Sequence, residues 1–260
     1  MNRYLEALQG LNLAAFWRGL QEGPGTLGRA SRAAYLAARS VATRPQVLLR
    51  ENVKQIPRVH LTELLRNGDC QITLRVMKYE DGMTPYNDAV ALLSILVAES
   101  PKEVLEIGTY MGHTARAMAE NLGNATIHTI DLPPGFSAAQ DIGDPLPKDD
   151  YHLIGRRILG REFRGKPCEG RIVQHCGDTA VMDFARIGRP TFFFIDGTHT
   201  YGHCKNDSEK CLAISPRGGT FLWHDCNEVH PGVVKFILEW RALGRDIVRI
   251  EGTDLAYWKS

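Results

Sequence analysis

The sequence predicts a doubly wound α/β domain that follows a helical N-terminal arm. Short apolar runs alternate with helical segments from about residue 80 to the end, which is typical of a parallel sheet covered on both faces. A chain of 260 residues is long enough for one such domain and an arm. Two of the runs, 192–195 and 220–223, end abruptly in aspartate and histidine, and ligands of such sheets bind at the strand ends.

We assign residues 1–58 to the arm and 59–260 to the domain. Apolar residues recur at helical spacing up to Leu20, EGPG at 22–25 interrupts them, and a second helical stretch follows. From Gly23 to Arg50 there are five arginines and no acidic residue. A basic amphipathic helix can lie on an anionic membrane or bind an acidic partner. We favour the alternative of an arm that packs on the domain or on a second subunit, and therefore expect a homodimer.

The domain begins with a predicted short helix at 60–65 and a strand at 71–76. Thr84 and Pro85 predict the start of a helix that runs to about residue 99, with proline at its first position. The remaining predicted strands are 103–107, 125–130, 171–175, 191–195, 219–223, 246–250 and 255–259.

A long insertion separates the predicted strands at 125–130 and 171–175. Residues 133–150 are rich in proline and glycine, and irregular loops of this kind often cover a site as a lid. Residues 151–167 are predicted to be helical and carry five basic side chains, namely Arg156, Arg157, Arg161, Arg164 and Lys166. They either attract an anionic acceptor or form a solvated helix face, and we favour the second interpretation.

Composition points to a small-molecule partner and a cytoplasmic location. The 31 basic and 30 acidic residues nearly balance, which argues against a general nucleic-acid binder. Six cysteines without a CxxC pair are expected to be reduced thiols. No apolar run approaches the roughly 20 residues that span a bilayer, and the N-terminus lacks the pattern of a signal peptide.

The loop after the strand at 103–107 predicts the cofactor. Glu106, Gly108 and Gly112 form the pattern ExGxxxG, whereas a dinucleotide site requires GxGxxG to bind a pyrophosphate. A carboxylate here would repel a diphosphate and suits a ligand with an ammonium group. Asp131 ends the next strand 19 residues after Gly112, where a carboxylate usually accepts the ribose hydroxyls. S-adenosylmethionine, a nucleoside with an amino-acid tail, meets both requirements.

With these motifs the chain resembles the class I S-adenosylmethionine-dependent methyltransferases over about residues 80–258. The resemblance implies a Rossmann-like, seven-stranded, mostly parallel sheet in the order 3-2-1-4-5-7-6. It also implies contacts of Glu106 and the glycine loop with methionine, of Asp131 with ribose and of Asp178 with adenine. The cofactor residues it implies are Glu106, Gly108, Thr109, Gly112, Thr114, Asp131, Leu132, Gly177, Asp178 and Asp196. The plainer alternatives are a tight turn for the glycines and a helix N-cap for Asp178.

The segments IDGTHTYGHCKND at 195–207 and GGTFLWHDCN at 218–227 resemble the small-molecule O-methyltransferases related to catechol O-methyltransferase. By that resemblance Asp196 and Asp225 are magnesium ligands, and His199 takes the proton of the acceptor hydroxyl. The chemistry agrees, because a divalent cation lowers the pKa of a bound hydroxyl, magnesium prefers oxygen ligands and histidine accepts protons near neutral pH. Plainer roles for Asp196 and His199 are a loop cap and a polar loop residue.

Two departures from that branch leave the metal site open. Cys226 stands where the branch has a metal-binding asparagine, although Asn227 follows it, and thiolate is a soft ligand poorly matched to magnesium. His224 stands in the place of an acid and is a ligand of a softer ion, a second proton acceptor, or a structural histidine tied to Asp225. The candidate catalytic residues are His199, Asp196 and His224, and the candidate metal ligands are Asp196, Asp225, His224 and Asn227.

Two other functions stay open at this point. One is metal-independent O- or N-methyl transfer by His199 and His224. The other is a non-catalytic protein with a nucleoside-binding fold that docks through its basic arm. The pattern around Glu106 disfavours a dehydrogenase.

Overall fold

The computed structural model describes residues 51–65, 69–75, 79–80, 82–136, 142, 150, 154–155, 157–215 and 218–260. The compact unit runs from Asn52 to Ser260. Val53 and Ile56 are buried in its core, and Arg58–Val59 pairs with the sheet. Residues 52–58 therefore pack with the domain, ahead of the boundary predicted at residue 58, and the division into arm and domain stays a prediction. The arm predicted over residues 1–50 lies outside the described residues.

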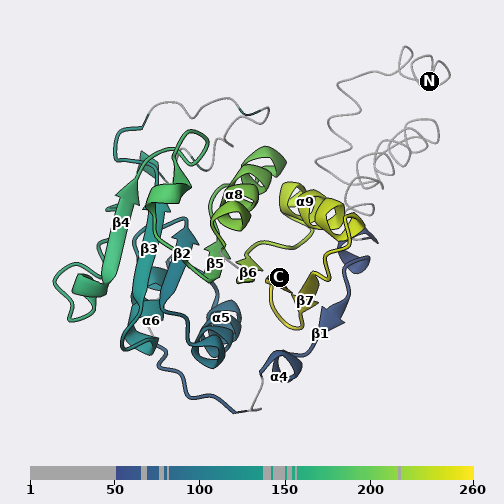
Figure 1. The fold of residues 1–260 in the computed structure, drawn as a ribbon, viewed down its shortest axis with the longest axis horizontal. Helices are drawn as coiled ribbons and strands as arrows, with labels where there is room; N and C mark the ends of the chain where they lie inside the picture. Colours follow the sequence, from purple (N-terminus) through teal and green to yellow (C-terminus); the bar gives the residue numbers. More distant parts are fainter. Residues whose placement is uncertain are drawn as a thin grey trace, which may run out of the picture. The chain divides into compact units, whose positions relative to one another are not determined.

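The sheet has eight strands in the order β1-β7-β8-β6-β5-β2-β3-β4 (Figure 1). Its strands are β1 Arg58–Val59, β2 Glu103–Ile107, β3 Thr126–Asp131, β4 Ile172–Cys176, β5 Phe192–Ile195, β6 Thr220–Trp223, β7 Val248–Ile250 and β8 Ala256–Lys259. All neighbours pair in parallel except β8, which is antiparallel to β6 and β7. The doubly wound class and the predicted order are confirmed, and β1 adds an eighth strand to the seven expected.

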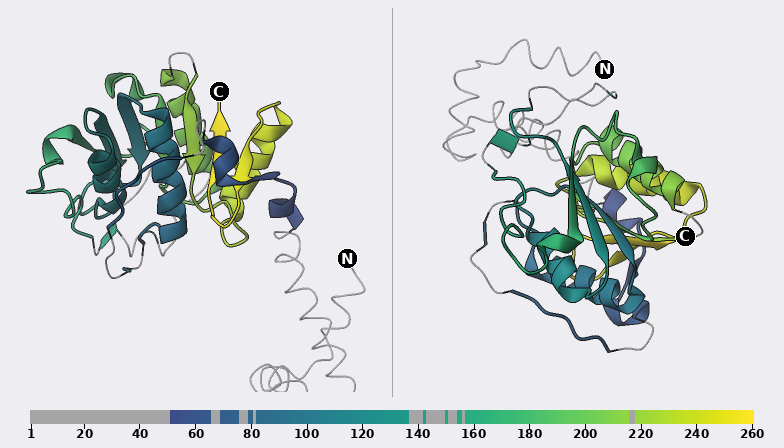
Figure 2. Two further views of the ribbon diagram at one scale, coloured as in Figure 1. Left: turned by 90° about the horizontal axis from the view of Figure 1, so that it is seen from below. Right: turned by 60° about the vertical axis from the view of Figure 1, so that its left-hand side comes forward.

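Helices cover both faces of this sheet (Figures 1 and 2). They are α4 Leu61–Leu64, α5 Tyr86–Glu99, α6 His113–Asn121, α8 Tyr201–Ile214 and α9 Pro231–Ala242, with 3₁₀ turns η2 Glu169–Arg171 and η3 Phe184–Arg186. The α5 and α6 helices pack on one face, and α8 and α9 pack on the other. Because helices cover both faces of the sheet, the strand side chains on both faces are apolar, as the strand sequences predicted.

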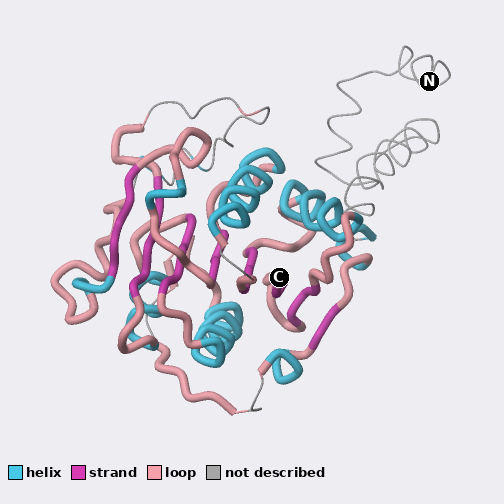
Figure 3. The backbone as a smooth tube through the Cα atoms, viewed as in Figure 1, coloured by secondary structure: helices cyan, strands magenta, loops and turns pink. Residues whose placement is uncertain are grey.

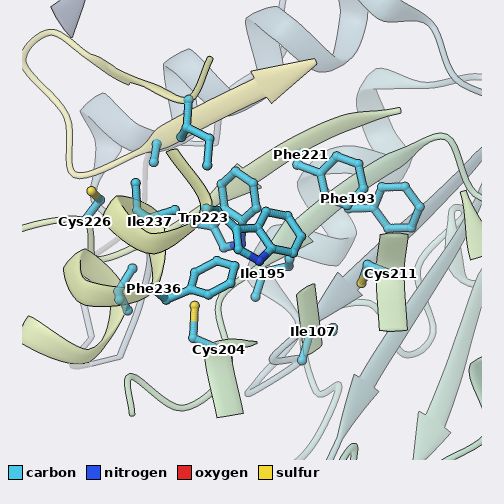
Figure 4. Packing of buried hydrophobic residues seen from close by; sticks show 14 of the residues in the cluster. Ile107, Phe193, Ile195, Cys204, Cys211, Phe221, Trp223, Cys226, Phe236 and Ile237 are labelled. Carbon is cyan, nitrogen blue, oxygen red and sulfur yellow. The ribbon is translucent and has the colours of Figure 1, made fainter. Parts of the chain in front are cut away.

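The alternation of side chains along each strand divides the core into two clusters. In β5, Phe193 and Ile195 pack on the α8 and α9 side, whereas Phe192 and Phe194 pack on the α5 and α6 side. Figure 4 shows the first cluster, in which the indole of Trp223 lies among side chains from the strands and side chains from the helices that cover them. Any polar side chain near a strand end is therefore directed to one of these two sides by its position in the alternation.

The predicted strand at 71–76 is wrong for its described part, because residues 71–75 pair with no strand. The Asn121 side chain replaces such a partner: the Thr73 N–H donates to its Oδ1 at 2.7 Å, and its Nδ2 donates to the Thr73 carbonyl at 2.9 Å.

The predicted helix over 151–167 is wrong for most of its described part: residues 154–155 are helical, but residues 159–168 form turns (Figure 3). Gly160 and Gly165 adopt positive φ angles, which end a right-handed helix. The Gly160 N–H donates to the Tyr110 carbonyl and the Glu162 N–H to the Met111 carbonyl. These turns therefore brace the loop that follows β2.

Smaller expectations have mixed outcomes. The helix after Thr84 is present, but α5 begins at Tyr86 and the Thr84 side chain does not cap it. None of the six cysteines, all within the described residues, forms a disulfide. Among the described residues, no helix is both long and apolar enough to cross a membrane.

Candidate active site

A cavity of about 400 Å³ opens at the carboxyl ends of β2, β3, β5 and β6. Most of the residues singled out in the sequence line it. They are Gly108, Thr109, Thr114, Asp131, Leu132, Gly177, Asp178, Asp196, His199, His224 and Asp225. Glu106, Gly112 and Asn227 are not among its lining residues. The apolar strands thus end in polar residues because those ends form the wall of one cavity.

The turn at residues 108–112, here called the glycine turn, brings the ends of β2 and β5 into contact. Gly108 has a φ of 103°, and a Cβ there would lie 2.0 Å from the carbonyl oxygen of Asp196. No other residue fits this position without moving a strand. Gly112 has a different role, because a Cβ there would meet the Phe163 ring at 2.6 Å. The absence of a side chain at Gly112 lets the turns at 159–168 pack against the start of α6.

Glu106 lies beneath the turn and not in the cavity wall. Alternation directs its side chain to the α5 and α6 side, where it is fully buried. The hydroxyl of Thr129 donates to its Oε2 at 2.5 Å, while Oε1 has no hydrogen-bond partner. Burial raises the pKa of Glu106 well above its usual value, and the nearby carboxylate of Asp196 raises it further. The predicted contact with an ammonium group is not formed here and stays a prediction.

Asp131 lines the cavity with its carboxylate already partnered. Its Oδ2 accepts from the Tyr110 N–H and its Oδ1 from the Leu132 N–H, each at 2.7 Å. The Arg157 guanidinium also contacts Oδ1 at 2.7 Å. Burial raises the pKa of Asp131 and this arginine opposes the shift. Of the described basic residues in the insertion, Arg157 is the one that lines the cavity.

At the far end of the cavity, Asp178 organises a turn. Its side chain accepts from the Ala180 N–H at 2.9 Å, and the ammonium of Lys210 is bound by the carbonyls of Thr179, Ala180 and Met182. The same wall contains Asp207. It is 2 % exposed, and burial raises its pKa to about 6.

At the ends of β5 and β6, Asp225 is the centre of a histidine cluster. Its Oδ2 lies 2.6 Å from His199 Nε2 and 2.9 Å from His224 Nδ1, and its Oδ1 lies 3.2 Å from His230 Nδ1. Burial opposes ionisation, but the three imidazoles lower the pKa of Asp225 overall. The φ of 58° at this residue is uncommon outside glycine, and such strain often accompanies function.

The two predicted histidines differ in their surroundings. Burial by itself lowers the pKa of His199, but the bond to Asp225 raises it overall. His224 is buried, and although burial opposes protonation, Asp196, Asp225 and Asp88 raise its pKa well above the usual value. Its Nε2 lies 2.9 Å from Asp88 and its Nδ1 lies 3.2 Å from Asp196. Nδ1 nevertheless makes no hydrogen bond.

The side chain of Asn227, predicted as a metal ligand, makes its hydrogen bonds within the scaffold of the site. Its Oδ1 accepts from the N–H groups of Val229 and His230, and its Nδ2 donates to Asp254 at 2.8 Å. The side chain holds the loop before α9, which explains why its oxygen does not reach the cavity. Cys226 is fully buried in the apolar core (Figure 4), so its thiol does not face the cavity either.

Sequence reasoning missed three residues of this cluster, namely Asp88, His230 and Asp254. Asp88 comes from the first turn of α5, and its carboxylate also accepts from the backbone N–H of Asp254. His230 lies before α9, with its ring 4.2 Å from that of His199. A histidine before a helix-opening proline was a visible signal for His230, whereas nothing local distinguished Asp88 or Asp254.

Two overlapping sets of side chains in the described part of the chain could hold a metal ion. One consists of Asp196, His224 and Asp225, and the other of His199, Asp225 and His230; within each set the ligand atoms lie within 4.8 Å of one another. Both share Asp225. An ion in the first set leaves His199 available for proton transfer, and an ion in the second does not.

Comparisons with known proteins agree with this geometry. Residues 105–226 match a family described as a methyltransferase domain. No curated protein matches the sequence. Among solved structures, a protein from Staphylococcus aureus described as a candidate caffeoyl-CoA O-methyltransferase shares 13 % identity, with a TM-score of 0.51, over 68 % of this chain and 85 % of its own.

Two further structures are similar. The SAH-bound methyltransferase of Podospora anserina shares 15 % identity with a TM-score of 0.50, over 91 % of this chain and 98 % of its own. The O-methyltransferase NovP shares 17 % identity with a TM-score of 0.50, over 66 % and 78 %. At such identities the likeness establishes the fold. Residues 105–226 therefore resemble a methyltransferase domain, and the fold of the chain is that of the class I S-adenosylmethionine-dependent methyltransferases.

Proposed function

We propose that the protein transfers a methyl group from S-adenosylmethionine to a hydroxyl of a small molecule. The supporting observation is that one cavity joins the glycine turn and Asp131 to the cluster around Asp225. A methyl donor at the first end and an acceptor at the second would meet inside it. Methyl transfer is a direct displacement, so alignment of acceptor oxygen, methyl carbon and sulfur contributes most of the catalysis.

The cofactor end fits a nucleoside with an amino-acid tail. We propose that Asp131 accepts the ribose hydroxyls and that Asp178 contacts adenine. An ammonium group would supply the missing partner of Glu106 Oε1, which is buried without a hydrogen bond. Burying an unpaired carboxylate oxygen is unfavourable, so a cation that reached it would be bound strongly.

The first metal set fits a divalent cation. The supporting observation is the buried Nδ1 of His224, which makes no hydrogen bond although carboxylate oxygens of Asp196 and Asp225 lie within 3.2 Å. We propose Asp196, Asp225 and His224 as ligands, without Asn227. A bound divalent cation lowers the pKa of a hydroxyl that contacts it.

His199 is the proposed base. Its Nε2 faces Asp225, so the hydroxyl proton is accepted at Nδ1, and Asp225 stabilises the imidazolium that results. The acceptor oxygen forms its bond to the methyl carbon as the carbon–sulfur bond breaks, and S-adenosylhomocysteine leaves. The acidic residues Asp196, Asp225 and Asp254 at this end favour a neutral or cationic acceptor over an anionic one.

One observation also favours a metal-independent version of the same transfer. The His199–Asp225 pair, at 2.6 Å, is a complete histidine–carboxylate dyad that can accept a proton by itself. An amine or hydroxyl of low pKa would then suffice as acceptor.

Two measurements test these proposals. Calorimetry with S-adenosylmethionine and S-adenosylhomocysteine should detect binding, and the absence of both would reject the methyltransferase function. Turnover after chelation, with and without added divalent ions, separates the two versions, since activity that survives chelation rejects the metal.

We also propose that the chain forms a homodimer, because its first 50 residues are too few to bury a core of their own. Light scattering of the full chain tests this, and a monomeric mass would reject it.

A further inference from the structure

Asp88 is a buried carboxylate that the proposed reaction does not use directly. It comes from the first turn of α5 and is 3 % exposed. Its Oδ2 lies 2.9 Å from Nε2 of His224, and its Oδ1 accepts from the Asp254 backbone N–H at 3.2 Å. Both oxygens therefore act as acceptors, one from a fixed backbone donor. A buried carboxylate held this way needs a donor on its other oxygen, and His224 supplies it.

This contact selects the tautomer of His224. With a hydrogen on Nε2, the ring presents a lone pair at Nδ1 once a bound cation has displaced the Nδ1 proton. Nδ1 is buried without a hydrogen bond, although Asp225 Oδ2 lies 2.9 Å and Asp196 Oδ1 3.2 Å away. Those oxygens are close enough to share a cation with Nδ1. A nitrogen lone pair and two carboxylates in this arrangement could hold a metal ion.

We propose that Asp88 is a positioning residue that makes His224 a nitrogen ligand, and that the resulting site selects a transition-metal ion such as Mn²⁺, Co²⁺ or Zn²⁺ over Mg²⁺. The inference rests on the metal-assisted version of the proposed function. Imidazole nitrogen suits transition metals, whereas magnesium requires oxygen ligands. Carboxylates that fix a histidine ligand in this way generally act on metal affinity.

The contact with Asp254 makes Asp88→Asn an informative variant. An asparagine has one acceptor oxygen, which either keeps the Asp254 N–H or accepts from His224 Nε2. If it keeps the backbone donor, the NH₂ group faces Nε2 and forces the hydrogen onto Nδ1, which removes the ligand lone pair. If it turns, the NH₂ group meets the Asp254 N–H. Either arrangement weakens the nitrogen ligand without changing the size of the side chain.

The test measures Co²⁺ and Mg²⁺ binding to the full chain by calorimetry, without S-adenosylmethionine. The wild-type protein should bind Co²⁺ more tightly than Mg²⁺, and Asp88→Asn should weaken Co²⁺ binding by roughly 10- to 100-fold. Asp207→Asn, which neutralises another buried carboxylate of the cavity wall, is the matched control and should bind Co²⁺ like the wild type. Long-range ¹⁵N spectra with Zn²⁺ should place the hydrogen of His224 on Nε2.

A second variant keeps the proposal testable if Asp88→Asn does not fold. His224→Asp makes the site all-oxygen and should lower the ratio of Co²⁺ to Mg²⁺ affinity by about tenfold or more. Equal binding of the two ions by the wild type, no binding of either, or Co²⁺ affinity in Asp88→Asn within twofold of the wild type would overturn the inference. Because no methyl donor is present, a protein that binds Co²⁺ as expected but transfers no methyl group would refute the proposed function alone.

Discussion

The two ends of the cavity differ in how their charged groups are satisfied. At the cofactor end, the carboxylate of Asp131 is bound by two backbone N–H groups and Arg157, and the turn of Asp178 is closed by its own backbone and Lys210. At the acceptor end, Asp225 is shared among three histidines, and Nδ1 of His224 lacks a hydrogen bond. The carboxylate of Asp131 is thus fully partnered, whereas Nδ1 of His224 lacks a hydrogen bond, as does Oε1 of Glu106 beneath the first end.

The two ends therefore have different roles: the cofactor end fixes the shape of the cavity, and the acceptor end carries the groups that react. Backbone donors and glycines build a fixed receptor, because their geometry follows from the strand ends. Side chains that compete for one carboxylate instead form a centre that a proton or a cation reorganises. Variants at the cofactor end should therefore affect folding and cofactor binding, while variants at the acceptor end should affect the reaction and leave the fold intact.

The largest expected effect is on the reaction, from Asp225→Asn. This change removes the charge that stabilises protonated His199 and a proposed metal ligand, so turnover should fall by about 100-fold or more. Methyl transfer from labelled S-adenosylmethionine measures it, with calorimetry of cofactor binding as the control. A variant that also loses cofactor binding would contradict the independence of the two ends.

The second effect is on folding, from Gly108→Ala. A Cβ would lie 2.0 Å from the Asp196 carbonyl at a φ of 103°, so the free energy of unfolding should fall by roughly 3 kcal/mol or more. Urea unfolding measures the change. Gly123→Ala is the control, because a Cβ at Gly123 meets no atom within 4 Å. Equal stability of the two variants would show that the glycine turn is not rigid.

A smaller effect is expected from Asp207→Asn at the adenine end. The folded pKa of Asp207, raised by burial to about 6, exceeds the unfolded value, so this group favours folding fully only below the unfolded pKa. That contribution is lost as pH rises through 6. The variant should be more stable than the wild type at pH 8 by about 1–3 kcal/mol, with a smaller gain at pH 5. Thermal unfolding at both pH values tests this, and a gain that does not depend on pH would contradict it.

The smallest effect concerns a histidine pair outside the cavity. Burial lowers the pKa values of His128 and His175, whose rings stack and whose nitrogens lie 3.1 Å apart. Their folded pKa values lie below the unfolded ones, so their contribution is present above the unfolded pKa and is lost as pH falls. His175→Gln should reduce the acid sensitivity of the melting temperature between pH 7 and pH 5. If the melting temperature of the variant fell between pH 7 and pH 5 as steeply as that of the wild type, this pair would not be the cause of the acid sensitivity.

The fold and part of the site were predictable for different reasons. Apolar strands, a glycine turn and acids at strand ends are local patterns. The family resemblance that they carry implied the strand order and pointed to Asp131, Asp196 and Asp225. The helix predicted over 151–167 was wrong at residues 159–167, where backbone hydrogen bonds to the loop after β2 hold turns instead. Asn227 was predicted as a metal ligand, but the N–H groups of its neighbours already occupy its oxygen.

The sequence by itself determined the alternation of strands and helices, and with it the edge of the sheet at which polar residues gather, because periodicity and strand ends are properties of neighbouring residues. Only the tertiary structure decided that Glu106 lies beneath the cavity, and that Asp88 of α5 meets His224 of the loop after β6, 136 positions along the chain. Such contacts depend on how a helix packs across a sheet face. No local sequence pattern specifies a contact between residues so far apart in the chain.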